Sequence, residues 1–369
     1  MKRWQLWVGV AISAFFLYQV LGDIDFALLW QDIVQANYFW ILPGVAVYFC
    51  AVWARAWRWH YLLRPILPIP TRKIFPIVSI GYAGNNIFLA RAGEVIRAII
   101  LRRNMGVPVT ASLATIVVER IFDGVVMLAF VFLNLPELAR LTKKFTVLGS
   151  LTIQDMTLWG SLAFVGALLV FLLAAMYPLQ SERFAAVLVK RFLPERLRTK
   201  SLDLVQRFLS GLESLRSPRD VLMVFVTSLV IWLLETVKYW FVMLAFDFEV
   251  SFFTLMLMNG VVNLATTIPS APGYIGTFDL PGIAVLQAYG VVKEVAASYT
   301  FVLHFALWLP ITVLGLFYMA REGVRWTSTV NEFKRAGELP PHSPEENGGT
   351  MPDSAGEDPV LPLSKVKGR

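Results

Sequence analysis

The stretch SIGYAGNNIFLARAGEVIR, residues 79–97, and a later stretch, NGVVNLATTIPSAPGYIGTFD, residues 259–279, interrupt a chain that otherwise consists of long apolar runs. Glycine or proline residues break both stretches. Non-helical backbone at membrane depth is tolerated only where protein or a water-filled cavity surrounds it. Broken segments at matching positions in two halves of a membrane protein indicate a transport site. We therefore expect the functional site at these two breaks.

The composition is that of a polytopic membrane protein. Of the 369 residues, 57% are hydrophobic and only 16% are charged. Apolar runs of about 20 residues, enough to cross a bilayer, recur through most of the chain. A soluble chain of this length would carry more charge and amphipathic periods, which are not seen before about residue 322. The predicted fold is all-α, with about six full transmembrane helices and two broken or re-entrant segments.

Other classes of protein are disfavoured by the side chains that the sequence lacks. The one cysteine, Cys50, lies in an apolar run, so neither a disulfide framework nor a thiolate metal site is expected. The histidines His60, His304 and His342 are too far apart to form a metal motif. The net charge of +7 comes from basic residues beside apolar spans, which indicates anionic lipid rather than nucleic acid. No cofactor is expected.

The basic residues give a membrane topology. Lys2 and Arg3 place the N-terminus inside and make the first apolar run an uncleaved signal anchor. The expected spans are residues 4–21, 38–57, 111–135, 158–177, 221–246 and 295–320. Basic residues flank the first broken segment on both sides, which favours a re-entrant hairpin; they are Arg72, Lys73, Arg102 and Arg103. The second broken segment is expected to enter from the outside. Both termini are then cytoplasmic, in the cell (inner) membrane.

The remaining segments complete this topology. The acidic stretch of residues 23–33 suits an interfacial helix, and residues 181–219 form a basic amphipathic stretch expected at the cytoplasmic membrane surface. The charges of Arg140, Lys143 and Lys144 oppose the topology, because they fall in a loop that it places outside. The transmembrane domain is expected over residues 1–325. Residues 326–369 are polar and rich in Pro, Gly and Glu, and they predict a disordered cytoplasmic tail.

The order of these segments predicts an inverted repeat. Span, span, broken hairpin and span occur twice, and the second copy begins on the opposite side of the membrane. A local echo supports the repeat, since Asn86 precedes Ala92-Gly93 and Asn263 precedes Pro272-Gly273.

Eight ionisable residues lie inside or beside apolar segments. They are Arg91, Glu94, Arg97, Glu119, Arg120, Asp123, Glu235 and Lys238. Each would cost roughly 2.5 to 3.5 kcal/mol at the bilayer centre, so they must face inward and pair. If helical, Arg91, Glu94 and Arg97 share a face on which the acid can bridge both arginines. Glu119 and Asp123 share a face, and Glu235 and Lys238 form an i, i+3 pair. Either these residues bind a headgroup or coupling ion, or they are ion pairs that fix helix register.

The second broken segment favours anions. Pro272 and Gly276 interrupt the helix, together with Gly273, and the chain resumes a helix near Thr277, just before Asp279. The free N–H groups at such a helix start suit a phosphate. The amides of Asn85, Asn86 and Asn263 can either satisfy backbone groups freed at the breaks or contact a ligand. His304 is expected to be a hydrogen-bonded helix residue rather than a proton relay.

Two motifs carry a family resemblance: ARAGEVIRAIILRRNMGVPVTASLATIVVERIFD, residues 90–123, and TTIPSAPGYIGTFD, residues 266–279. They resemble the flippase-like transmembrane domain of the lysylphosphatidylglycerol synthase family, which also groups uncharacterised bacterial and archaeal inner membrane proteins. The resemblance covers about residues 4–321. It implies translocation of a lipid, such as an aminoacylated phospholipid, between leaflets. The full synthases carry a soluble aminoacyl-transferase domain after the membrane part, whereas a short tail follows Arg325 here, so lysyl transfer is not expected.

The sequence therefore predicts a protein that moves or binds a phosphate-bearing lipid. Arg91 and Arg97 would pair with its phosphate, and Glu94, Glu119 and Asp123 would balance the arginines, receive a cationic headgroup or take up a coupling proton. No Walker motif is present, so ATP hydrolysis is not expected. Two alternatives stay open. One is a membrane transferase with Asp123 or Asp279 as base, and the other is a non-catalytic partner of lipid-synthesis enzymes.

Overall fold

The computed structural model describes residues 3–22, 24–88, 92–134, 146–148, 151–152, 162, 166, 169, 177–192, 194–195, 198, 202, 217–268 and 270–322. These residues are helical apart from turns and a two-stranded antiparallel ribbon of β1 (Thr146–Leu148) and β2 (Leu151–Thr152). The predicted all-helical architecture is confirmed in this part of the chain. Arg91, the basic loop with Arg140, most of the 158–177 span and the tail of residues 326–369 lie outside it.

The helices of the first half are α1 (Arg3–Leu21), α2 (Phe26–Gln35), the 3-10 turn η1 (Tyr38–Trp40), α3 (Ile41–Leu63), α4 (Thr71–Ile87), α5 (Ala92–Met105) and α6 (Val109–Leu133). Those of the second half are α9 (Pro178–Phe192), α11 (Pro218–Met243), α12 (Phe252–Ala265), the 3-10 turn η3 (Pro272–Tyr274), α13 (Asp279–Ala288) and α14 (Lys293–Arg321). Side-chain caps explain several starts: the Asp25 carboxylate accepts the backbone N–H of Ala27, and the Ser251 hydroxyl accepts that of Thr254.

Fewer helices qualify as membrane spans than the six expected. Among the described residues, three are long and apolar enough to cross a bilayer, namely 38–63, 219–243 and 293–321. A fourth results if α1 and α2, bent by 90°, count as one broken span. α6 has 25 residues, about 37 Å of helix, and so the length to cross, but three ionisable residues lie within it. The count of six is therefore not established.

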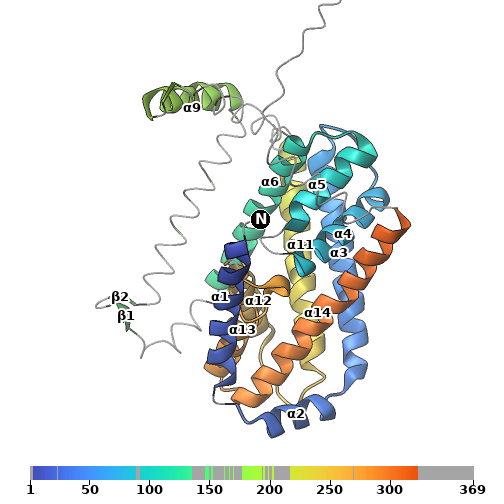
Figure 1. Ribbon diagram of the computed structural model, residues 1–369, viewed down its shortest axis with the longest axis vertical. Coiled ribbons are helices and arrows are strands. Elements are labelled where there is room, and N and C mark those ends of the chain that lie inside the picture. The colour runs from blue at the N-terminus through green and yellow to red at the C-terminus, as the bar shows by residue number, and fades with distance from the viewer. Residues whose placement is uncertain are drawn as a thin grey trace, which may run out of the picture.

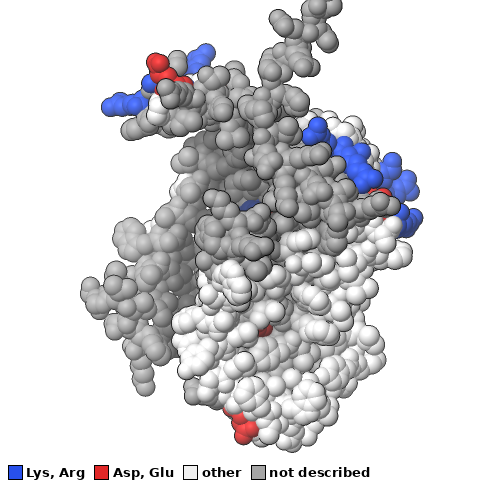
Figure 2. Space-filling model, viewed as in Figure 1, with Lys and Arg blue, Asp and Glu red and all other residues white. Residues whose placement is uncertain are grey.

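The two ends of the molecule carry opposite charge. Figure 2 shows Lys and Arg gathered at the end where α4 and α5 meet the close of α14, and acidic side chains at the opposite end beside α2. The exposed basic side chains of the first end include Arg72, Lys73, Arg102 and Arg103. A hydrogen bond of 2.6 Å from Asn104 to Glu322 joins α5 to α14 there. We refer to these as the basic end and the acidic end.

Each broken segment forms a hairpin that leaves and returns to the same end. The chain enters from the basic end along α4 and returns along α5, whereas α12 and α13 enter and return at the acidic end (Figure 1). The first hairpin depends on a close approach at Gly93. A Cβ atom at this position would lie 1.8 Å from the carbonyl oxygen of Gly81, so α4 and α5 pack backbone to backbone.

The described helices repeat one order with inverted direction. α3, the α4–α5 hairpin and α6 are followed by α11, the α12–α13 hairpin and α14 (Figure 1). The contacts respect this order, because α3 packs on α11, α4 packs on α14, and α12 packs on α6. Each hairpin of one half is thus held by the closing helix of the other half, which brings the two hairpin tips together.

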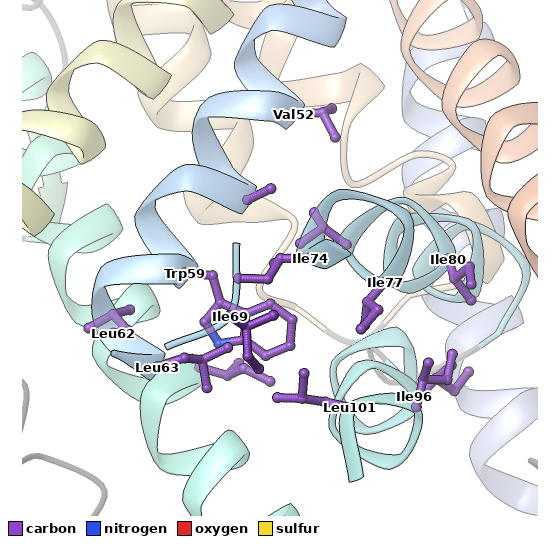
Figure 3. Close-up of a cluster of buried hydrophobic side chains, with 14 of the residues drawn as sticks. Val52, Trp59, Leu62, Leu63, Ile69, Ile74, Ile77, Ile80, Ile96 and Leu101 are labelled. Atoms are coloured by element: carbon purple, nitrogen blue, oxygen red, sulfur yellow. The ribbon is translucent and has the colours of Figure 1, made fainter. Parts of the chain in front are cut away.

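The largest buried apolar cluster anchors the first hairpin at the basic end. Trp59, Leu62 and Leu63 of α3 meet Ile74 and Ile77 of α4 (Figure 3). Ile96 and Leu101 of α5 complete the contact. Each of these side chains is almost fully buried, and burying one contributes about 1.5–3 kcal/mol. The hairpin is therefore part of the core rather than a surface loop.

Candidate functional site

A cavity of about 150 Å³ lies where the two hairpin tips meet. From the first hairpin it is lined by Asn85, Gly93, Glu94 and Arg97, among others. The second hairpin contributes Asn263, Thr266, Gly273, Tyr274 and Phe278. The remaining walls come from α3, α6, α11 and α14 and include Tyr48, Arg55, Arg120, Trp232, Glu235, Lys238, His304 and Trp308. The two breaks therefore face one polar cavity.

One buried ion-pair group joins α3 to α11. The Arg55 guanidinium donates to the Glu235 carboxylate over 2.9 Å, and the Lys238 ammonium donates to the other oxygen of Glu235. The predicted i, i+3 pair of Glu235 and Lys238 is thus confirmed. Aromatic faces lie against both cations, with Lys238 4.5 Å from the Tyr48 ring centroid and Arg55 5.2 Å from that of Trp232. Such faces stabilise cations that have lost part of their hydration.

A second group joins α5 to α6. Arg97 donates to Glu119 over 2.7 Å, and its guanidinium lies 4.2 Å from the Trp59 ring centroid. Arg120 lies within 3.5 Å of both Glu94 and Asp123, and within 3.9 Å of Glu119. Glu94, which was expected to bridge Arg91 and Arg97, pairs with Arg120 of α6. Arg97 pairs with Glu119 of the same helix α6, and Arg91 lies outside the described residues.

Asp123 lies behind the cavity rather than in its wall. Its carboxylate is 1% exposed and accepts hydrogen bonds from Arg58, over 2.5 and 3.3 Å, and from the Trp232 indole, over 2.9 Å. Glu119 is likewise 1% exposed and absent from the lining. These two carboxylates hold arginines in place, whereas Glu94, Arg97 and Arg120 reach the cavity.

The second hairpin turns through two left-handed glycines. Gly273 and Gly276 have φ of +76° and +84°, conformations that a side chain disfavours, and Pro272 opens the turn. The helix restarts at Asp279, close to the predicted position, and its carboxylate accepts the backbone N–H of Gly276 over 2.8 Å. His304 of α14 contacts this carboxylate over 2.8 Å. The histidine is hydrogen bonded, as predicted, but the sequence did not indicate its acidic partner.

The asparagines divide between structure and cavity. Asn86 donates to Thr312 over 2.8 Å, and Asn263 donates to the Asn259 carbonyl over 2.8 Å, so both satisfy groups near the breaks. The side-chain oxygen of Asn85 is buried without a hydrogen-bond partner and belongs to a lining residue. It is therefore a free acceptor for a ligand donor.

The cavity has an excess of positive charge and unused donors. Its lining holds four cations, Arg55, Arg97, Arg120 and Lys238, against two carboxylates, Glu94 and Glu235, which gives a net charge of +2 without the histidine. The Nε atoms of Arg55 and Arg97 are buried without a hydrogen-bond partner, and that of Arg120 lies 3.5 Å from a Glu94 oxygen. A buried unsatisfied donor of a charged group costs free energy until an acceptor reaches it. The site therefore favours a small anion with several oxygens.

Two arginines of α3 were not among the predicted site residues. Arg55 lines the cavity and Arg58 anchors Asp123. A signal for Arg55 was present, since it lies inside the predicted span of residues 38–57 and so needed an inward partner. Its partner, Glu235, is 180 residues away in sequence, too far for a helical spacing rule to find.

Comparison with known proteins gives a family and several relatives. The family model described as "Lysylphosphatidylglycerol synthase TM region" matches residues 6–315. An archaeal relative, "UPF0104 membrane protein" of Methanothermobacter thermautotrophicus, is 24% identical over 83% of this chain and 91% of its own. "Glycosyltransferase AglD" of Haloferax volcanii is 26% identical over 80% of this chain but only 49% of its own. "UPF0104 membrane protein MJ1595" of Methanocaldococcus jannaschii is 21% identical over 84% of this chain and 92% of its own.

Proposed function

Since the chain belongs to the family of the lysylphosphatidylglycerol synthase TM region, we propose that this integral membrane protein binds a phosphate-bearing lipid and moves its headgroup between leaflets. The headgroup would occupy the cavity between the two hairpin tips, and the acyl chains would stay in the bilayer. Only the polar part of the lipid then needs a polar path through the membrane.

One observation carries the proposal: four cations converge on a cavity of about 150 Å³, and two of them, Arg55 and Arg97, keep a buried Nε donor without a hydrogen-bond partner. A guanidinium presents donors in a planar fork that matches phosphate oxygens. Arg55 and Arg97 are nine-tenths buried, so their bonds to phosphate would form in a largely dry site. Arg91 would be a further phosphate partner, as the sequence analysis predicts.

The carboxylates have a distinct role in this proposal. Glu94 pairs with Arg120, and Glu235 pairs with Arg55 and Lys238. A phosphate that enters the cavity would replace a carboxylate as the partner of one of these cations. The released carboxylate could then bind a cationic part of the headgroup, such as an amine. Zwitterionic or aminoacylated phospholipids would then fit better than a lipid with phosphate alone.

The test is leaflet exchange of labelled phospholipids in proteoliposomes. We expect exchange above that of empty liposomes for wild type, and a fall of about tenfold or more for Arg97→Gln and for Arg55→Gln, because each removes a charge-assisted bond to the headgroup. Arg64→Gln is the matched control. Arg64 is half exposed outside the cavity, 3.7 Å from Asp220, and its loss is expected to leave exchange unchanged. Unfolding of each variant is measured at the same reconstitution level.

Wild-type exchange no faster than in empty liposomes, for every lipid of the panel, would contradict translocation. Lipid exchange that is unchanged in both Arg97→Gln and Arg55→Gln would show that the headgroup does not bind in this cavity.

A second candidate function follows from one relative. Because a protein 26% identical to this chain is named a glycosyltransferase, this chain could serve a lipid-linked sugar pathway as a transferase or as its membrane partner. The two carboxylates that the sequence analysis offers as bases are unsuited to that role, since Asp123 is bound by Arg58 and Asp279 by His304. A sugar-lipid product formed by the purified protein with a sugar donor would favour the transferase.

A further inference from the structure

His304 joins α14 to the second hairpin through both of its ring nitrogens. Nδ1 lies 2.8 Å from an oxygen of the Asp279 carboxylate, and Nε2 lies 2.7 Å from the carbonyl oxygen of Gly273. The ring also stacks on Phe278, with centroids 4.4 Å apart. Asp279 is 1% exposed, while His304 belongs to the cavity lining. A buried acid and a cavity-facing imidazole therefore form one unit.

Counting protons in this unit gives a result that geometry alone decides. A neutral imidazole has one N–H donor and one bare nitrogen acceptor. The carbonyl oxygen of Gly273 can only accept a hydrogen bond, so Nε2 must carry a proton and donate to it. If Asp279 is ionised, it too can only accept, and a neutral histidine would then present a lone pair to a carboxylate over 2.8 Å. The contact between His304 and Asp279 is favourable only when the two side chains together hold one proton more than a neutral histidine and an ionised aspartate.

The extra proton belongs on the imidazole. Asp279 is the first residue of α13, where free backbone N–H groups and the helix dipole favour a negative charge. The backbone N–H of Gly276 donates to the second oxygen of this carboxylate over 2.8 Å. With an ionised carboxylate on one side and a carbonyl on the other, this geometry gives His304 a donor role at both ring nitrogens.

We propose that Asp279 and His304 form a proton-binding site of the transporter, and that proton binding there favours anion binding in the cavity. The second clause rests on the proposed function. With the proton bound, the pair is neutral and the cavity lining keeps its net charge of +2. Without the proton, the pair carries a net charge of −1 beside the cavity. His304 of α14 can then donate a hydrogen bond to only one of its two acceptors, Asp279 or the carbonyl of Gly273. Linkage requires that proton and anion strengthen each other's binding.

Other charged groups face His304 across the cavity. They are Arg55 of α3, Glu94 and Arg97 of α5, Arg120 of α6, and Glu235 and Lys238 of α11. Tyrosines also face it, namely Tyr48, Tyr82, Tyr239 and Tyr274. Each of the six charged groups takes part in an ion pair, and Arg55 and Lys238 share Glu235. From α12, the lining groups are the amide of Asn263 and the hydroxyl of Thr266. Asp279, which is buried and not itself a lining residue, is the acid in hydrogen-bond contact with the imidazole.

The direct test is nitrogen NMR of the full chain with ¹⁵N-labelled histidine in lipid nanodiscs. The chain has three histidines, so His304→Gln assigns the signal. At about pH 6 we expect both nitrogens of His304 to carry a proton, and we expect Asp279→Asn to convert the ring to a singly protonated form. A singly protonated ring in the wild type from about pH 5 to about pH 8 would overturn the proposal.

The linkage is tested by exchange of an anionic phospholipid in proteoliposomes at about pH 6 and about pH 9. We expect wild-type exchange to fall about tenfold at the higher pH and His304→Gln to lose this dependence. His60→Gln is the matched control, because His60 also bonds a carbonyl, that of Ile69 over 2.6 Å, but lies outside the cavity lining. It is expected to keep the wild-type profile.

The two arms fail separately. An imidazolium at His304 without any lipid exchange would leave the proton site standing and remove the proposed function. Exchange with the same pH dependence in wild type and His304→Gln would instead overturn the linkage.

Discussion

At the scale of single residues, Asp123 and Arg58 show how a charge can be buried without lying in the site. The carboxylate is held by two bonds from Arg58 and one from Trp232, and the Arg58 guanidinium also donates to Ser228 over 2.9 Å. Both side chains are 1% exposed. Their attraction offsets the loss of hydration only while both partners are present.

Removing one partner is therefore expected to cost more than removing both. Arg58→Met should lower the free energy of unfolding by about 3–5 kcal/mol, because it leaves the Asp123 charge without its main partner. The double variant Arg58→Met with Asp123→Leu should recover a large part of that loss. Denaturant unfolding in mixed micelles measures both. A double variant no more stable than Arg58→Met alone would contradict a loss caused by the unpaired Asp123 charge.

The sequence predicted residue pairs within one helix but not those between helices. Glu235 with Lys238 follows from the helical repeat and is confirmed. The ion pair of Asp123 with Arg120, also i, i+3, was not among the predicted pairs. The pair of Arg58 and Asp123 spans 65 residues, so no local spacing rule indicates it. The same limit hid the contact of His304 with Asp279, which depends on how α14 packs against α13. The location of both breaks, by contrast, was readable from glycine and proline alone.

At the scale of elements, each hairpin depends on glycine residues, which have no side chain. α5 approaches α4 so closely at Gly93 that a Cβ would also lie 2.6 Å from the Asn85 side chain. The apolar cluster of α3, α4 and α5 holds the same two helices together at the basic end. Near the cavity, α4 and α5 are therefore positioned by backbone contact at Gly93.

Adding one methyl group at Gly93 should force α4 and α5 apart. Gly93→Ala is expected to lower the free energy of unfolding by about 3 kcal/mol and to abolish exchange, because the clash is with backbone atoms that cannot rotate away. Gly44→Ala is the control. Gly44 lies in α3, where a Cβ would be an ordinary 3.4 Å from the Cβ atom of Phe241 in α11, and alanine favours helix by up to about 1 kcal/mol. Equal stability of both variants would contradict the tight hairpin.

At the scale of the whole molecule, the inverted order of helices has a counterpart in the site. In the first half, Arg97 of the returning helix α5 pairs with Glu119 of the closing helix α6. In the second half, Asp279 of α13 pairs with His304 of α14, over nearly the same distance. The two pairs occupy matching places and reverse the sign of the hairpin charge. The repeat was readable from topology, but this correspondence required the packing.

The charge of the two ends predicts orientation. With Cys50 replaced by alanine, Asn104→Cys at the basic end and Asp247→Cys at the acidic end should react with an impermeant maleimide from opposite sides. From the positive-inside rule we predict that Asn104 faces the cytoplasm. A cysteine at Phe88, next to the first tip, should react with neither reagent side if α4 and α5 form a re-entrant hairpin. Reaction of Phe88→Cys from the outside would make the pair two full crossings.

The shortness of the hairpin helices also has an electrical consequence. α4 and α12 have 17 and 14 residues, about 25 and 21 Å of helix, against a hydrocarbon core of about 30 Å. The two hairpin tips meet at the cavity, so we expect the apolar layer between the two aqueous sides to be thinnest there. The membrane voltage would then fall over a short distance around the cavity, and a charge crossing it exchanges about 2.3 kcal/mol per 100 mV with the field. A fold of this kind would concentrate the driving force at the place where we propose that the headgroup binds.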